Sequence, residues 1–320
     1  MEFSRRDFVR FLPTLIALGF MPRTLLADSP PPGTPGHSGF NFRYIYNNEK
    51  LRDRFHLFLQ NVYSLYPDPQ AHKLILELTS SLKWDEDIYR ELQKRFPDIK
   101  PFLSIFRASL PALHKQKIEM QKQTSTLIAD MKEVDGYIEI GTTGRYFEGI
   151  RECVKVTGST YVLNTAGPTY NPGDIAERGQ IVKVGKYIAM GDYDPVSAKM
   201  IKPGSVDLIS NYIGFHHAPP ARRDAFIESV ATTLRPGGRL VLRDHDADTE
   251  QMKFMAALAH DVFNAGLDIS WEKNLAETRN FTSIDQIADK LSSYGLKPQS
   301  SRLLQDGDPT CNTLMVFVKS

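Results

Sequence analysis

Apolar residues between about positions 47 and 131 recur at steps of three and four, which is typical of helices that bury one face. Prolines interrupt this pattern several times, so it predicts a set of short helices rather than one long one. The predicted helices cover residues 51–62, 68–82, 85–96, 101–110 and 111–131.

The pattern changes after residue 135, where short apolar segments alternate with helical and loop segments. A helix is predicted over 220–234, between the last two of these segments. Strands that alternate with helices favour an α/β fold with a doubly wound, mostly parallel sheet, whose ligands bind at the carboxyl ends of the strands. The predicted strands are 137–141, 161–164, 187–190, 206–211 and 239–243.

Net charge and cysteine content exclude some classes of protein but do not identify one. The chain has 320 residues and a formal net charge of +1, which argues against a nucleic-acid partner. Its two cysteines, Cys153 and Cys311, match no zinc or redox spacing.

The first 39 residues have the layout of an export signal. Arg5 and Arg6 precede Phe8, an apolar run over 11–21 and Ala27, and a segment rich in Pro, Gly and Ser follows at 28–39. The arginine pair resembles a twin-arginine signal, so the twin-arginine export machinery is a predicted partner and the periplasm the predicted location. An uncleaved signal would tether the chain to the inner membrane through residues 8–21. The alternative is an amphipathic helix of a cytoplasmic protein.

Four motifs in order resemble those of the class I S-adenosylmethionine-dependent methyltransferases, over about residues 113–319. They are "EIGTTG" at 139–144, "MGDYD" at 190–194, "VDLISNYIGFHH" at 206–217 and "LRPGGRLVLRD" at 234–244. The resemblance implies a seven-stranded Rossmann-like sheet closed by an antiparallel pair of strands, with S-adenosylmethionine as cofactor. The predicted domains are a signal (1–27), a linker (28–39), a helical extension or lid (40–131) and a methyltransferase domain (132–320).

The resemblance also assigns cofactor contacts. The amino-acid end of the cofactor would lie against the first motif, the ribose against Asn164 and the adenine against Asp192. Thr143 and Arg145 stand where the family often has glycines, and Asn164 stands where it usually has a carboxylate. The full predicted set is Glu139, Gly141, Thr142, Thr143, Gly144, Asn164, Asp192 and Asn211.

Candidate catalytic residues follow the fourth and fifth strands, namely His216, His217 and Asp244. One histidine could act as a general base, the group could bind a divalent metal, or the side chains could be structural. Adjacent histidines point apart on an extended chain, so no metal ligand is predicted. His260 and Asp261 are predicted to be a helix-capping or surface pair. The segment 271–281 is either a pocket wall or, as charged segments usually are, a solvated face.

These observations predict a methyltransferase that acts on a small-molecule or lipid-like acceptor under the helical lid. Asn211-Tyr212-Ile213-Gly214 lacks the Asn-Pro-Pro-aromatic motif of methyltransferases that act on DNA bases. The alternative hypothesis is an exported small-molecule-binding protein that reuses the fold without catalysis, because S-adenosylmethionine is not replenished outside the cytoplasm. Metal-dependent hydrolysis is a third possibility, which predicts bound metal.

Overall fold

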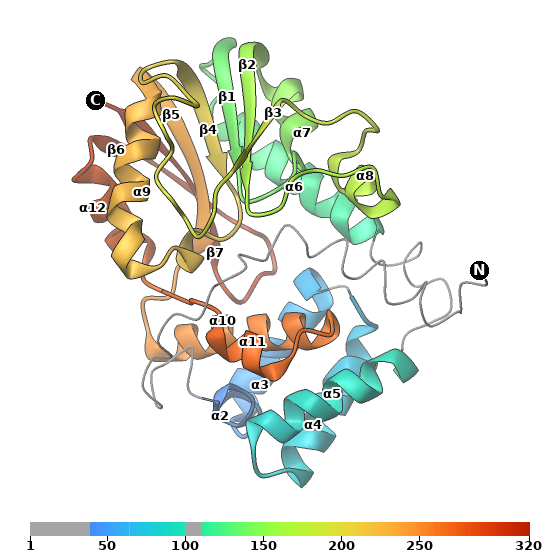
Figure 1. Ribbon diagram of the computed structural model, residues 1–320. Coiled ribbons are helices and arrows are strands. Elements are labelled where there is room, and N and C mark those ends of the chain that lie inside the picture. The colour runs from blue at the N-terminus through green and yellow to red at the C-terminus, as the bar shows by residue number, and fades with distance from the viewer. Residues whose placement is uncertain (1–38, 64, 100–109) are drawn as a thin grey trace.

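The computed structural model describes residues 39–63, 65–99 and 110–320. The fold consists of a sheet with helices on both faces and a separate layer of helices. This layer lies next to the carboxyl ends of the strands (Figure 1). The predicted signal, nearly all of the linker and the predicted helix at 101–110, apart from Leu110, lie outside the described residues.

The sheet has seven strands in the order β3-β2-β1-β4-β5-β7-β6. Strands β1 to β5 are parallel to one another, whereas β7 is antiparallel to both β5 and β6. The predicted fold class is therefore confirmed, including the antiparallel pair that closes the sheet. The strands are β1 (Glu133–Ile140), β2 (Lys155–Asn164), β3 (Lys186–Ala189), β4 (Val206–Asn211), β5 (Leu234–His245), β6 (Leu296–Leu304) and β7 (Asn312–Lys319).

Alternate strand residues supply two separate cores, one on each face of the sheet. Tyr137 and Leu208 pack with the helices of one face, and Ile138 and Ile209 pack with those of the other. A capping box at Ser283 starts one of the helices on the second face. The helices are α6 (Leu110–Leu127) and α7 (Phe147–Cys153) on the first face, and α9 (Pro220–Thr233) and α12 (Ile284–Ser292) on the second.

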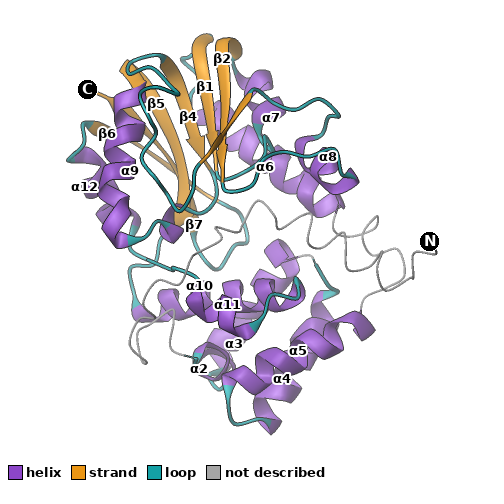
Figure 2. Cartoon of the chain, viewed as in Figure 1, coloured by secondary structure: helices purple, strands orange, loops and turns teal. Residues whose placement is uncertain are grey.

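The helical layer combines two distant parts of the chain (Figure 2). Its amino-terminal part consists of α2 (Asn41–Tyr46), α3 (Glu49–Phe58), η1 (Leu59–Tyr63), α4 (Asp68–Ser81) and α5 (Asp85–Ile99). It shares one apolar core with α10 (Glu250–Gly266) and α11 (Trp271–Ala276), which follow β5. The layer therefore differs from the predicted lid over 40–131. It gains α10 because that helix is apolar on nearly every side, and it lacks α6, which packs on the sheet.

None of the described helices is long and apolar enough to cross a membrane.

The helical layer contains a buried carboxyl group, Asp85, at the start of α5. It accepts hydrogen bonds from the Phe42 backbone N–H (2.8 Å) and from Nε of Arg43 (3.1 Å). Burial raises the pKa of Asp85 to about 7, and these two donors only partly oppose the shift. The folded chain therefore holds this proton more tightly than the unfolded chain, where aspartate has a pKa of about 3.9.

We expect the stability that Asp85 contributes to be complete below about pH 4 and to be lost progressively as pH rises from there to about 7. Relative to Asp85→Asn, wild type should lose up to about 1.4 kcal/mol of unfolding free energy per pH unit in this window. Urea unfolding from about pH 4 to about pH 8 measures the difference. The exposed neighbour variant Asp87→Asn should show no such trend. A wild type that gains stability over Asp85→Asn with rising pH would contradict the assignment.

Candidate functional site

A cavity of about 310 Å³ lies between the carboxyl ends of β4 and β5 and the helical layer. Both the helices and the sheet end contribute apolar and polar residues to its lining. We call it the central cavity. Apolar lining residues include Phe58, Leu113, Ile213 and Phe263, and polar lining residues include Arg145, His216, Arg243, His245, His260 and Glu277.

The two adjacent histidines lie in a 3₁₀ turn, η3 (Phe215–His217), directly after β4. Gly214 enters the turn with φ of +89°, a left-handed conformation that glycine adopts without strain. The turn brings the rings of His216 and His217 to the same side, with centroids 4.2 Å apart. The expectation that the two histidines point apart is therefore wrong, because it assumed an extended chain.

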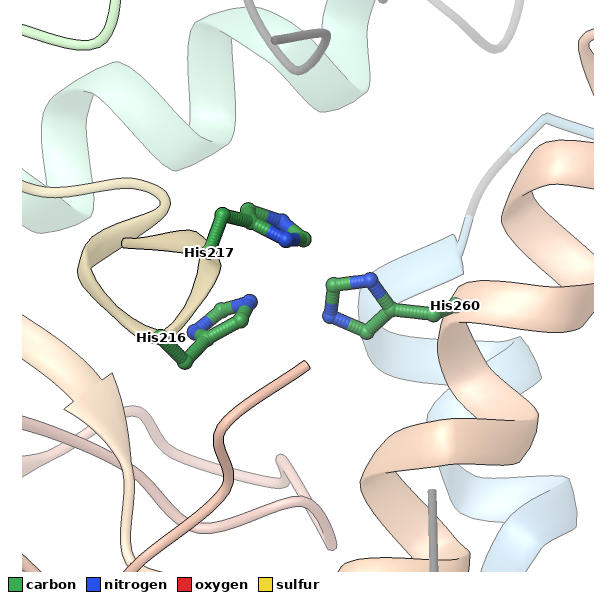
Figure 3. Close-up of side chains that lie close together, drawn as sticks. All are labelled: His216, His217 and His260. Carbon is green, nitrogen blue, oxygen red and sulfur yellow. The ribbon is translucent and has the colours of Figure 1, made fainter. Parts of the chain in front are cut away.

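His260 reaches the same place from the opposite side, on α10. Figure 3 shows its ring facing the rings of His216 and His217 across the gap between η3 and α10. His260 is largely buried, and Asp261 is 2% exposed and paired with Arg279 at 2.7 Å. The prediction of a capping or surface pair is wrong for both residues, because α10 is covered by the amino-terminal helices.

Three of the histidine rings are held through Nδ1. His216 Nδ1 lies 2.7 Å from Oδ1 of Asp244, and His217 Nδ1 lies 2.7 Å from the carbonyl oxygen of Thr278. The Asp244 oxygen also accepts the backbone N–H of His245. His245 Nδ1 in turn lies 3.1 Å from the carbonyl oxygen of Thr310. The candidates His216, His217 and Asp244 thus do lie together.

Burial controls the charge of this group. It lowers the pKa of His216 and His260 well below the usual range and also lowers the pKa of His245, so these rings are neutral near pH 7. Burial would raise the pKa of Glu277, but Arg279 and the neighbouring histidines together lower it well below its usual value. The site therefore contains neutral imidazoles around an ionised carboxylate. Such rings can accept a proton or bind a metal ion.

Glu277 and Arg279 decide between two sequence alternatives. The segment 271–281 was expected either to wall a pocket or to be a solvated face. Arg279 is buried, and Glu277 is largely buried and lines the central cavity. Their alternation with polar neighbours in the sequence gives no sign of burial, because the covering surface comes from α10 and η3. Arg145 was also missed as a cavity residue, because the residues that surround it come from other parts of the sequence.

The first motif forms the predicted tight turn after β1. Glu139 accepts hydrogen bonds from the hydroxyl of Thr142, from the Tyr146 backbone N–H (3.1 Å) and from the Tyr137 hydroxyl (3.2 Å). Gly141 has φ of +88°, and a Cβ there would lie 2.7 Å from the carbonyl oxygen of Ile213. The turn is thus fixed by its own contacts.

A short helix, α8 (Pro172–Arg178), covers this turn and lies beside α6 (Figure 1). Thr143 donates to Asp174 at 2.6 Å, and Arg145 pairs with Glu177 at 2.8 Å. Both side chains stand where the family often has glycines, so the departures from the family motif are the residues that hold α8. After α8, Val184 packs so close to Gly144 that a Cβ there would lie 2.7 Å from it.

The predicted cofactor contacts are consequently enclosed by protein. Thr142 is 0% exposed, Thr143 5% and Asn164 2%. Asn164 donates to the carbonyl oxygen of Ala166 at 3.1 Å. With α8 in this position, Thr142, Thr143 and Asn164 expose little surface that a cofactor in the family's usual place could contact. Two of the predicted contacts differ from these residues because they have a polar atom without a partner. Oδ1 of Asp192 and Oδ1 of Asn211 are buried and have no hydrogen-bond partner among the described residues.

No protein-family description and no curated protein sequence matches this chain. Solved structures with a similar fold include the 1,6-didemethyltoxoflavin-N1-methyltransferase of Burkholderia thailandensis, with 13% identity and a TM-score of 0.44 over 73% of this chain and 90% of that one. The N-methyltransferase NodS of Bradyrhizobium japonicum has 17% identity and a TM-score of 0.41 over 63% and 86%. The pyocyanin biosynthetic protein PhzM has 12% identity and a TM-score of 0.44 over 86% and 74%. These similarities are distant and carry no conclusion about activity.

Proposed function

We propose that this protein binds a small molecule in the central cavity and uses a methyltransferase fold without S-adenosylmethionine in the family's cleft. The observation that carries the proposal is the enclosure of the first motif by α8, through Thr143–Asp174 and Arg145–Glu177. A buried ion pair of this kind is costly to break, because each charge would be left without its partner. We therefore place the ligand in the central cavity, which is separate from the cofactor contacts that α8 covers.

The lining of the central cavity suggests the chemistry of the ligand. Phe58 and Phe263 offer apolar contact on the side of the helical layer. Arg243, which is 6% exposed, lies on the opposite wall, and its Nε has no hydrogen-bond partner among the described residues. A small molecule with an aromatic or aliphatic body and one anionic or acceptor group matches this arrangement.

The export signal is compatible with this proposal. We propose that the twin-arginine machinery carries the folded chain to the periplasm, or leaves it tethered to the inner membrane through residues 8–21. S-adenosylmethionine is not replenished there, whereas a cavity ligand would not depend on the cytoplasm. A lipid-like ligand is part of the same proposal, and nucleic acid is not expected as a partner.

A second candidate function is S-adenosylmethionine-dependent methyl transfer to a small acceptor in the central cavity. The observation that favours it is the pair of unpartnered buried oxygens on Asp192 and Asn211, which stand where the family resemblance places cofactor contacts. This function requires α8 to leave its position over Thr143 and Arg145. The general base would then be sought among His216, His217 and His260, with Asp244 holding His216.

Calorimetric titration of the full chain with S-adenosylmethionine and S-adenosylhomocysteine separates the two functions. We expect no binding of either compound, in wild type or in Asp192→Ala. Binding in the micromolar range that weakens at least tenfold in Asp192→Ala would overturn the first proposal and support methyl transfer. Binding that Asp192→Ala leaves unchanged would overturn both the first proposal and the predicted adenine contact.

The cavity itself can be tested with 8-anilinonaphthalene sulfonate, which combines apolar rings with one anionic group. We expect one molecule to bind per chain, and Ala259→Trp, which fills part of the cavity, to weaken binding at least tenfold. Ala221→Trp, on the exposed surface of α9, is the matched control. Leu113→Trp fills the cavity from α6 and serves if Ala259→Trp does not fold. Equal binding by the cavity and control variants would contradict the proposal.

A further inference from the structure

We propose that His216, His217 and His260 bind one divalent transition-metal ion, with Glu277 as its carboxylate partner, at the floor of the central cavity. One nitrogen of each imidazole lies within 4.8 Å of the others (Figure 3). Metal–nitrogen bonds of about 2.0–2.1 Å place two ligands of a tetrahedral ion about 3.4 Å apart. Small rotations of the rings bring the nitrogens to that spacing. This site goes beyond the proposed function and rests on no part of it.

The hydrogen bonds fix which nitrogen each ring offers. The carbonyl oxygen of Thr278 can only accept, so Nδ1 of His217 donates to it, and in the neutral ring Nε2 carries the lone pair. Asp244 Oδ1 already accepts the His245 N–H, so His216 likewise donates from Nδ1. Rings that bind metals through one nitrogen are typically oriented through the other by a carboxylate or carbonyl, as these are.

One of the resulting lone pairs has no hydrogen-bond donor near it. Nε2 of His216 is buried and has no hydrogen-bond partner among the described residues. A buried acceptor without a donor is destabilising, and a cation bound to this nitrogen removes that cost. Nε2 of His217 lies 3.7 Å from Oε1 of Glu277. The 3.7 Å distance is close to the separation of two ligands on one ion.

The surroundings suit a bound ion. Glu277 offers a negative charge to the ion, and Arg279, which donates to it at 2.8 Å, holds it in place. Oε2 of Glu277 lies 3.5 Å from Nδ1 of His260, which leaves Nε2 of that ring for the metal. The ring of Phe281, 5.1 Å from that of His216, forms an apolar wall. Imidazole nitrogens favour Zn²⁺, Cu²⁺, Fe²⁺ or Ni²⁺ over Mg²⁺ or Ca²⁺.

The ion would be accessible to a ligand, because His216, His260 and Glu277 line the central cavity. A position facing the cavity could take water or an oxygen of a bound molecule, which the ion would polarise as a Lewis acid. His245 stands close by, with its ring centroid 5.2 Å from that of His216. It would lie at the edge of this open position.

The experiment is metal binding by the full chain after treatment with a chelator. Co²⁺ serves as the probe because its visible absorption reports the coordination geometry, and Zn²⁺ competition follows. We expect one Co²⁺ per chain with the absorption of a low-symmetry nitrogen and oxygen site, displaced by one Zn²⁺. His217→Gln and His260→Gln should each weaken binding at least 100-fold. Glu277→Gln should weaken it about 10- to 100-fold.

His72→Gln is the matched control. His72 and His56 form the other close histidine pair among the described residues, with ring centroids 4.1 Å apart, and they lie in the helical layer away from the cavity. The control should bind Co²⁺ as wild type does. Circular dichroism verifies that each variant is folded. A folded wild type that binds no Co²⁺ or Zn²⁺ overturns the proposal, and so does binding that His72→Gln abolishes while His217→Gln and His260→Gln retain it.

Discussion

Replacing Arg145 by alanine is expected to lower the free energy of unfolding by about 3–5 kcal/mol. Arg145 and Glu177 are 1% and 2% exposed, and their charged groups lie 2.8 Å apart. The substitution leaves the Glu177 carboxylate buried under α8 without its cation. Burial already raises the pKa of Glu177, so the unpaired group would either carry a desolvated charge or take up a proton. Urea unfolding followed by circular dichroism measures the loss.

A surface ion pair provides the control for Arg145. Arg95 and Glu77 lie 2.8 Å apart but are 38% and 53% exposed, so Arg95→Ala should cost less than about 1 kcal/mol. The double variant Arg145→Met with Glu177→Leu removes both charges and should recover most of the loss. If Arg145→Ala lowers the free energy of unfolding no more than Arg95→Ala does, this ion pair does not hold α8 over the first motif. The proposal that α8 encloses the cofactor contacts would then lose its main support.

Replacing Arg279 by leucine is expected to have an effect of similar size, about 3–5 kcal/mol. Arg279 donates to Asp261 and Glu277, and it also reaches the amide oxygen of Asn274 at 2.7 Å. Asp261 in turn accepts a hydrogen bond from Asn41 of α2 at 2.7 Å. One guanidinium therefore connects α2, α10, α11 and the loop that carries Glu277. Without it, two buried carboxylates lose their cation.

Hydrogen exchange distinguishes a local effect of Arg279→Leu from a global one. We expect amides of α2 and α10 to lose protection along with the fall in unfolding free energy. Arg302→Leu is the control, because Arg302 pairs with Asp285 where both side chains are at least 40% exposed, and it should cost less than about 1 kcal/mol. Equal stabilities of the two variants would mean that the network does not hold α2, α10 and α11 together.

The motifs of the first and fourth strands have a structural role in this chain, whatever they bind. Glu139 closes the turn after β1, and Gly141 lets that turn approach Ile213 beyond β4. These contacts keep the carboxyl ends of β1 and β4 together, which places η3 above the sheet. The same residues can therefore persist when the cofactor is lost, and their presence in a sequence does not by itself establish the chemistry.

The sequence by itself determined the sheet and much of its order of elements. Apolar strands such as 206–211 and turns such as Pro236-Gly237-Gly238 are local patterns, and local patterns report backbone conformation and burial. It also brought His216, His217 and Asp244 together, because parallel strands end at one edge of a sheet. The alternation of strands with helices and the order of the motifs predicted the fold class without any tertiary contact.

Tertiary structure alone decided what surrounds that edge. Glu277 and Arg279 look like surface charges in the sequence, and His260 looks like part of an exposed helix, because the covering segments come from elsewhere in the chain. Helix α10 and η3 cover the two charged residues, and amino-terminal helices more than 150 residues away cover α10. The turn of η3 reversed the expected direction of the two adjacent histidines. The position of α8 followed from two side-chain pairs, Thr143–Asp174 and Arg145–Glu177, more than 30 residues apart. Such long-range contacts leave no periodic signal in the sequence. The packing of α8 over the first motif and the approach of His260 to His216 and His217 are therefore visible only in the folded chain.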